Sequence, residues 1–175
     1  MPAEQSPFAG KLFNQLPLEQ GYESREKYQA HLFEQYKLFV EMADRISSRR
    51  QAANSYFVSI NTAIFGFVGY VGAKDSAGYL WLVAVGGITL SYLWYRLICS
   101  YRGLNTAKFK VIHEIEKRLP LSPYDAEWEA VERENNPELY RPFTHIETGV
   151  PWVFVALHAV AMLHSFPWGQ VRHWF

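Results

Sequence analysis

Two polar residues that could support chemistry lie inside long apolar runs of this sequence. They are Asn61 and His158. An amide among apolar groups costs free energy unless it is hydrogen-bonded, so Asn61 should either bond another helix or contact an ion or substrate. A neutral His158 could bond Asn61, Thr89 or a backbone carbonyl, or it could handle a proton or an ion. These two residues are the intramembrane polar candidates of the chain.

A regular row of small residues marks the first apolar run. Intervals of four, three, four, three and four residues separate Ser55, Ser59, Thr62, Gly66, Gly69 and Ala73. This period places all of them on one face of a helix, where small side chains let two backbones approach closely in lipid. Three interpretations stay open: packing within the chain against Gly86 and Gly87, packing between copies, or the lining of a pore wetted at Ser59 and Thr62.

Other chemical motifs are weak or absent from the sequence. His113 and Glu116 stand at helical spacing, but no second histidine-containing pair accompanies them, so we interpret both as part of a solvated charged face. The acidic stretch 124–134 is also interpreted as solvated, although a basic partner could use it. The sequence contains no phosphate-binding glycine loop, no GxSxG and no HExxH. We therefore predict a protein that is not an enzyme, with no metal, no cofactor and no nucleic-acid partner.

Two uncharged runs predict a transmembrane helical hairpin. No charged residue occurs from Tyr56 to Ala73 or from Ala77 to Tyr95. Each run is long enough, at roughly 1.5 Å per helical residue, to cross the hydrocarbon of a bilayer. Aromatic residues flank both runs, as they do at membrane interfaces. The turn from Gly72 to Gly78 would join the two helices.

A third uncharged run, from Gly149 to Phe166, predicts a third transmembrane helix, with an interfacial helix as the alternative. Its beginning has two interpretations. Thr148 could be the N-cap, with Pro151 in the first turn. A capping box from Thr144 to Glu147 would instead start the helix earlier and place Pro151 at a kink.

Basic residues predict the orientation in the membrane. They gather before the first run, after the second and before the third: Arg45, Arg49, Arg50, Arg96, Arg102, Lys108, Lys110 and Arg141. Only Lys74 and Arg172 fall on the opposite side. The positive-inside rule therefore predicts that the N-terminus and both large polar regions face the cytoplasm.

The two polar regions carry amphipathic helices that continue the spans. Before the first span, apolar residues recur at helical spacing, with Gln35 or Tyr36 filling the gap in the row Tyr28, Leu32, Phe39, Ala43 and Ile46. After the second span, one side of the helix carries Leu104, Ala107, Val111, Ile115 and Leu119. These two apolar stripes would pack against each other within the chain or between copies.

The sequence therefore predicts an all-α integral membrane protein with a transmembrane helical hairpin, cytosolic helical extensions and a third transmembrane helix. Its expected parts are a flexible N-terminal tail (1–22), a cytosolic amphipathic helix (23–54), the transmembrane hairpin (55–98), a cytosolic helical region (99–147), the third transmembrane helix (148–166) and an outer tail (167–175).

One block of the sequence resembles a known family. The block runs from Tyr101 to Trp128, YRGLNTAKFKVIHEIEKRLPLSPYDAEW, and it is similar to the RipA family of octameric membrane proteins. The segment THIETGVPWVF, from Thr144 to Phe154, fits the return of such chains to the membrane, and the likeness covers roughly residues 25 to 160. The resemblance implies a multi-pass protein of the bacterial inner membrane that self-assembles, as an octamer, without enzymatic activity. It supplies no active-site residue.

The layout is also similar, in architecture alone, to the two-helix SLATT-type membrane effectors of antiphage systems. Three functions are then open. The chain could form a homo-oligomer whose spans gate or permeabilise the membrane, as an antiphage or stress effector. It could be a non-conducting scaffold that organises partner proteins, or a small proton-coupled carrier that depends on His158. The expected partners are membrane lipids, further copies of the chain and a protein on the cytosolic face.

Overall fold

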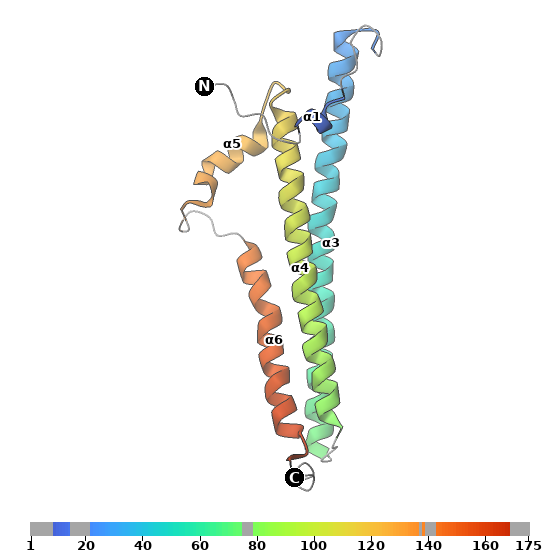
Figure 1. The fold of residues 1–175 in the computed structure, drawn as a ribbon, viewed down its shortest axis with the longest axis vertical. Coiled ribbons are helices and arrows are strands. Elements are labelled where there is room, and N and C mark those ends of the chain that lie inside the picture. The colour runs from blue at the N-terminus through green and yellow to red at the C-terminus, as the bar shows by residue number, and fades with distance from the viewer. Residues whose placement is uncertain (1–8, 15–21, 75–78, 137, 139–142, 169–175) are drawn as a thin grey trace. The chain divides into compact units, whose positions relative to one another are not determined.

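A computed structural model describes residues 9–14, 22–74, 79–136, 138 and 143–168. These residues contain no strand. Their helices are α1 (Ala9–Leu12), α3 (Arg25–Lys74), α4 (Leu80–Glu116), α5 (Pro123–Ala130), the short 3-10 helix η1 (Glu132–Glu134) and α6 (Phe143–Ser165) (Figure 1). Three of them, α3, α4 and α6, contain stretches long and apolar enough to cross a membrane. The all-α membrane fold predicted from the sequence is therefore confirmed.

Helices α3 and α4 are long because no proline interrupts either segment. Ser24 precedes α3, and its hydroxyl accepts a hydrogen bond from the backbone N–H of Lys27 at 3.1 Å, as an N-cap does. Helix α4 ends at Glu116, just before the proline-containing segment 119–123. In α3 and in α4, the polar segment and the neighbouring apolar run thus form one continuous helix, as the sequence predicted.

Helix α6 follows the earlier of the two starts that the sequence allowed. It begins at Phe143, before residue 148, and Pro151 lies inside it. Pro151 has no N–H to donate, so the carbonyl of Glu147 loses its usual partner one turn back. The turn was predicted from Gly72 to Gly78, but α3 continues to Lys74. The rest of the predicted turn, 75–78, and most of the predicted outer tail, 169–175, lie outside the described residues.

The chain divides into two compact units, and α3 and α4 contribute residues to both. Unit 1 contains residues 1–47 and 103–141, and unit 2 contains residues 48–102 and 142–175. In unit 1, the first part of α3 packs against the last part of α4. The buried centre of this contact is Tyr36, Ala43, Ile112 and Ile115. The two amphipathic stripes therefore pack within the chain.

The residues predicted for this contact in unit 1 are not all used. Of the predicted residues, Ala43 and Ile115 belong to the buried centre, and Leu32, Phe39 and Val111 pack against it. Ile46 is half-buried. Leu104, however, is 49 % exposed, while Ile112, which the sequence interpretation did not single out, is fully buried. The packed stripe of α4 therefore includes Ile112 beside the predicted Val111 and Ile115, and it does not include Leu104.

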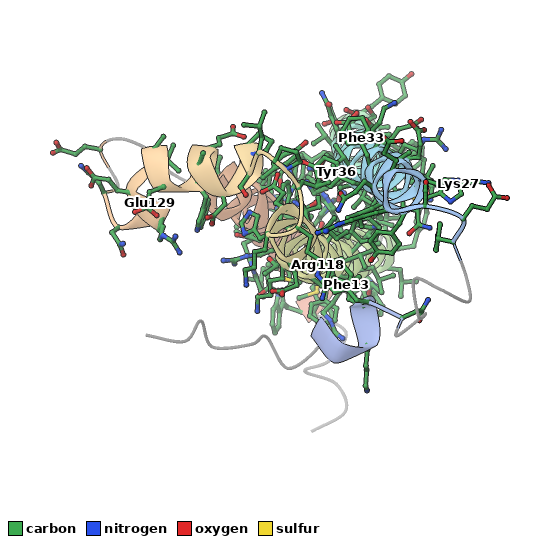
Figure 2. The ribbon with its side chains drawn as sticks, turned by 90° about the horizontal axis from the view of Figure 1, so that it is seen from above. Phe13, Lys27, Phe33, Tyr36, Arg118 and Glu129 are labelled. Atoms are coloured by element: carbon green, nitrogen blue, oxygen red, sulfur yellow. The ribbon has the colours of Figure 1, made fainter. Side chains whose placement is uncertain are left out.

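Two residues of the N-terminal segment contact the rest of unit 1. Helix α1 and the residues after it lie in the segment 1–22 that was predicted to be a flexible tail, of which 1–8 and 15–21 lie outside the described residues. Leu12 and Phe13 pack against the centre of unit 1. The guanidinium carbon of Arg118 lies 3.2 Å from the centroid of the Phe13 ring (Figure 2). A helix of four residues is too short to show a repeating apolar pattern that could be recognised in the sequence.

Unit 2 contains parts of α3 and α4 together with α6. Its buried apolar residues include Leu80, Ala84, Trp94 and Ile98. Large apolar side chains such as Val160 remain exposed on the outside of this unit, as expected for helices whose outer surface contacts lipid. The polar side chains of Asn61, Ser91 and His158 are buried inside the unit instead.

Candidate functional site

Three buried polar side chains meet inside unit 2, one from each of its helices. They are Asn61 of α3, Ser91 of α4 and His158 of α6, and each is 0 % exposed. The hydroxyl of Ser91 donates to Asn61 Oδ1 at 3.0 Å, and His158 Nε2 lies 3.1 Å from the same oxygen. One amide oxygen therefore joins all three helices, and we call these three residues the polar junction.

The hydrogen bonds of Asn61 determine which ring nitrogen of His158 carries hydrogen. Asn61 Nδ2 donates to the backbone carbonyl of Phe57 at 2.8 Å, so Oδ1 is the atom that faces the other two helices. Because Oδ1 can only accept, His158 must donate from Nε2. Its Nδ1 has no hydrogen-bond partner among the described residues, so a proton there would be a buried donor without an acceptor, which costs free energy. This favours a neutral histidine that joins helices.

Gly87 makes this close approach of α6 to α4 possible. A Cβ atom built on Gly87 would lie 2.5 Å from both ring nitrogens of His158, well inside van der Waals contact. The Ser91 hydroxyl also lies 2.8 Å from the Gly87 carbonyl, so its single hydrogen has two acceptors to choose from. The ring of Phe65 packs against His158 with centroids 5.3 Å apart.

A second set of contacts joins the same three helices nearer the start of α6. Trp94 Nε1 donates to Asn54 Oδ1 at 2.9 Å, and Asn54 Nδ2 donates to Glu147 Oε1 at 3.1 Å. Arg50 Nε lies 3.5 Å from the other carboxylate oxygen of Glu147. The ring of Trp94 also stacks on Phe57, with centroids 5.8 Å apart. We call Arg50, Asn54, Trp94 and Glu147 the interfacial clamp.

The interfacial clamp was missed from the sequence, although a signal for it existed. Asn54 and Asn61 are seven residues apart, which places them on the same side of a helix two turns apart. Glu147 had been considered only as part of a capping box at the beginning of the third helix. Its carboxylate instead accepts from Asn54 of another helix.

The row of small residues faces away from these contacts. Its described members are all exposed, namely Ser55, Ser59, Thr62, Gly66 and Gly69, while Ala73 lies where side chains are not described. A Cβ on Gly66 or Gly69 would meet no atom within 4 Å. We call this surface the small-residue face. Its predicted partner Gly87 packs against His158 instead, and Gly86 has open space around it. The described part of the chain therefore does not cover the small-residue face.

Unit 1 contains a buried carboxylate that the sequence interpretation placed in solvent. Glu116 is 0 % exposed, so the interpretation of this residue as part of a solvated face was wrong. Its carboxylate accepts hydrogen bonds from the hydroxyl of Tyr36 at 2.8 Å and from the backbone N–H groups of Tyr124 and Asp125 at 3.1 and 3.2 Å. Glu116 thereby caps the first turn of α5, where a negative charge is favourable.

Tyr36 completes this arrangement from α3. Burial, followed by the hydrogen bond to Glu116, raises the pKa of the Tyr36 hydroxyl far above its usual range. The neutral hydroxyl can donate to the carboxylate, whereas a phenolate would repel it. Tyr36 occupies the position that the sequence left open in the apolar stripe of α3. Its ring fills that position, and its hydroxyl donates to Glu116.

The acidic segment 124–134 remains at the surface, as predicted. Helix α5 has no buried residue. Arg133 Nε lies 2.6 Å from Glu129 and its Nη2 lies 3.8 Å from Asp125. Within the part of the chain that the structure describes, no three His, Cys, Asp or Glu side chains are grouped as metal ligands would be. The buried polar groups of both units thus form hydrogen bonds between helices.

Comparison with known proteins identifies the family of the chain. Residues 33–167 match the family model described as the octameric membrane protein family (8xMP). No curated protein and no solved structure matches the chain. The matched residues include every member of the polar junction and of the interfacial clamp.

Replacing Gly87 by alanine should destabilise unit 2. The added methyl group would collide with the His158 ring, and overpacking of this kind costs about 1 to 3 kcal/mol. Gly86→Ala is the matched control, because the space around Gly86 is open and alanine favours a helix by up to about 1 kcal/mol. Thermal unfolding of the purified protein should show a lower Tm for the first variant only. Equal Tm values for the two variants would contradict the packing described for His158.

The Tyr36 hydroxyl should make stability depend on alkaline pH. Because its pKa is raised in the folded protein, its contribution is fully present below about pH 10 and is lost as the pH rises from there towards the folded-state pKa. The Tm of the wild type should therefore fall relative to that of Tyr36→Phe between pH 9 and pH 11. The other tyrosines contribute equally to both proteins. A difference in Tm that does not change with pH would show that Tyr36 is not buried against Glu116.

Proposed function

The chain belongs to the octameric membrane protein family and is a homo-oligomeric membrane protein, and from this premise we propose that its copies assemble through the small-residue face of α3 to gate or permeabilise a membrane. The proposed location is the bacterial inner membrane, with the N-terminus in the cytoplasm. The basic residues next to the spans support this orientation. A role as an antiphage or stress effector would follow from such an activity.

The uncovered small-residue face is the observation that carries this proposal. Successive residues of a helix are rotated by about 100° around its axis. On α3, Gly66 therefore lies nearly opposite Ile64 and more than a quarter turn from Asn61. Asn61 bonds the other two helices, so the small-residue face points away from them. A face of exposed glycine, serine and threonine lets a second helix approach closely in lipid. An oligomer must have a seam between copies, and this face is free to form it.

The continuity of the long helices supports a gated assembly. α3 and α4 each supply residues to unit 1 and to unit 2. A partner that binds unit 1 would therefore act on the helices that also contain the apolar spans. The Glu116 carboxylate joins α3, α4 and the start of α5 in unit 1, so a change in α5 would reach both long helices. We propose that unit 1 senses a cytosolic signal or protein in this way.

The proposed activity is not enzymatic. The polar groups of unit 2 are engaged in bonds between helices: His158 contacts Asn61 and packs against Gly87. This engagement favours a structural role for His158 over proton-coupled transport, because a carrier needs a polar site that its substrate can reach.

A non-conducting scaffold is the second candidate, and one observation favours it. The hydroxyl of Ser59 donates to the carbonyl of Ser55 in its own helix at 2.8 Å. A hydroxyl that is satisfied by its own backbone offers less to water in a pore and suits a dry contact between helices. In this alternative the assembly organises partner proteins without carrying ions.

Enlarging the small-residue face should break the assembly. Gly66→Leu and Gly69→Leu place a bulky side chain in space that is open in the single chain, so the fold should be retained while the close contact between copies is lost. Native mass spectrometry in mild detergent should show a large multiple of the 20.3 kDa chain for the wild type and smaller species for the variants. Ala156→Leu, at an exposed position of α6, is the control and should assemble normally. Survival of the oligomer in both glycine variants would rule out this seam.

Flux through vesicles should separate the two candidate functions. Purified oligomer is reconstituted into liposomes that contain a self-quenched dye, and release is measured with and without a cytosolic extract. The proposed function predicts release by the wild type and little release by Gly66→Leu. An intact oligomer that releases no dye under either condition would contradict permeabilisation and favour the scaffold.

A further inference from the structure

Arg96 is the first charged residue after the apolar run of α4, and its side chain is exposed. Its one polar contact among the described residues is with Tyr92, one turn earlier, whose phenolic oxygen lies 3.3 Å from Arg96 Nη1. Tyr92 is exposed as well. Both side chains therefore lie on the outer surface of unit 2, at the point where the apolar run ends.

No carboxylate among the described residues of unit 2 balances the charge of Arg96. Glu147 is the only carboxylate among the described residues of that unit, and it is engaged by Arg50 and Asn54 in the interfacial clamp. Arg45, in unit 1, shows the contrasting arrangement, because it lies 2.6 Å from Glu41. An exposed arginine without an acidic partner next to an apolar surface indicates that the counter-charge comes from outside the chain.

The donors of this pair suit a phosphate group. A guanidinium carries five N–H donors in a fork that matches phosphate oxygens. One of them donates to the oxygen of Tyr92, which leaves the Tyr92 O–H free to donate in turn. The remaining N–H groups and this O–H have no acceptor among the described residues, and they come from one turn of one helix. Charge-assisted hydrogen bonds from such groups are the strong ones in phosphate recognition.

Neighbouring aromatic rings indicate the depth of the pair in the bilayer. Tyr95 packs against Trp152 of α6, with ring centroids 5.3 Å apart. Tyrosine and tryptophan gather where the hydrocarbon meets the lipid headgroups. Arg96 directly follows Tyr95 in the chain, so its guanidinium lies at the level where lipid phosphates are found.

We propose that Arg96 and Tyr92 bind the headgroup phosphate of an anionic phospholipid at the outer surface of unit 2. The net negative charge of such a lipid supplies the missing counter-charge, which a zwitterionic lipid does not. The pair would hold one lipid to each copy of the chain. This inference does not depend on whether the assembly conducts.

Native mass spectrometry of the purified, delipidated oligomer tests this site. The probes are phosphatidylglycerol and phosphatidylcholine, each added at the same concentration. The wild type should retain more phosphatidylglycerol than phosphatidylcholine. Arg96→Gln should lower the affinity for phosphatidylglycerol roughly five-fold, the usual contribution of one basic residue near an anionic surface. Tyr92→Phe, which keeps the ring and removes the hydroxyl, should lower it by a smaller factor.

Three controls make the result decisive. Arg45→Gln removes an exposed arginine that already has an acidic partner, and it should leave lipid retention unchanged. Arg96→Lys keeps the charge and should retain part of the preference for phosphatidylglycerol, which separates lost binding from lost folding. Inorganic phosphate at millimolar concentration should not displace the lipid. Equal effects of Arg96→Gln and Arg45→Gln, equal retention of the two lipids by the wild type, or full displacement by free phosphate would each overturn the proposal.

Discussion

The buried amide of Asn61 is the constraint on which the membrane-embedded part of this protein depends. An amide in an apolar environment must find partners, because leaving it without hydrogen bonds costs several kcal/mol, roughly 2 to 7 depending on the reference state. Asn61 meets this requirement with a carbonyl of its own helix, the hydroxyl of Ser91 and the ring of His158. Those bonds determine which side of α3 faces α4 and α6. They also require a glycine at position 87, since a larger residue would not leave room for the histidine ring.

The direction of Asn61 also determines what remains outside. When the polar side of α3 turns inward, the small-residue face turns outward, and the described residues do not cover it. The assembly proposed above places this face at the contact between copies, which an oligomeric family requires. Unit 1 also contains a buried polar group that must be hydrogen-bonded. There the buried carboxylate of Glu116 is satisfied by the hydroxyl of Tyr36 and by the first turn of α5.

The membrane-spanning helices could be predicted from the sequence, whereas most of the buried polar contacts could not. Uncharged runs of this length indicate membrane spans. For Asn61 and His158 the sequence left open a bond to each other, bonds to other groups, or contact with an ion or substrate, and the structure places the two side chains in contact. Glu116 was misplaced because a carboxylate on a charged helix resembles a solvated one until the proline-containing turn brings the N–H groups of α5 back to it. Leu104 and Ile112 are eight residues apart, and only the packed structure shows which of them faces α3. The role of the small-residue face could not be chosen from sequence, since that choice depends on which side of the helix is already occupied.

The most direct measurement of this account is a structure of the assembled oligomer in lipid nanodiscs, determined by electron cryomicroscopy at a resolution that shows side chains. The account predicts that Asn61, Ser91 and His158 meet within each copy, and that the small-residue face of α3 lies against a neighbouring copy. A map in which this face contacts lipid, while the seam is formed by another surface, would contradict the account. A map in which Asn61 bonds a neighbouring copy instead of its own α6 would contradict the polar junction within each copy.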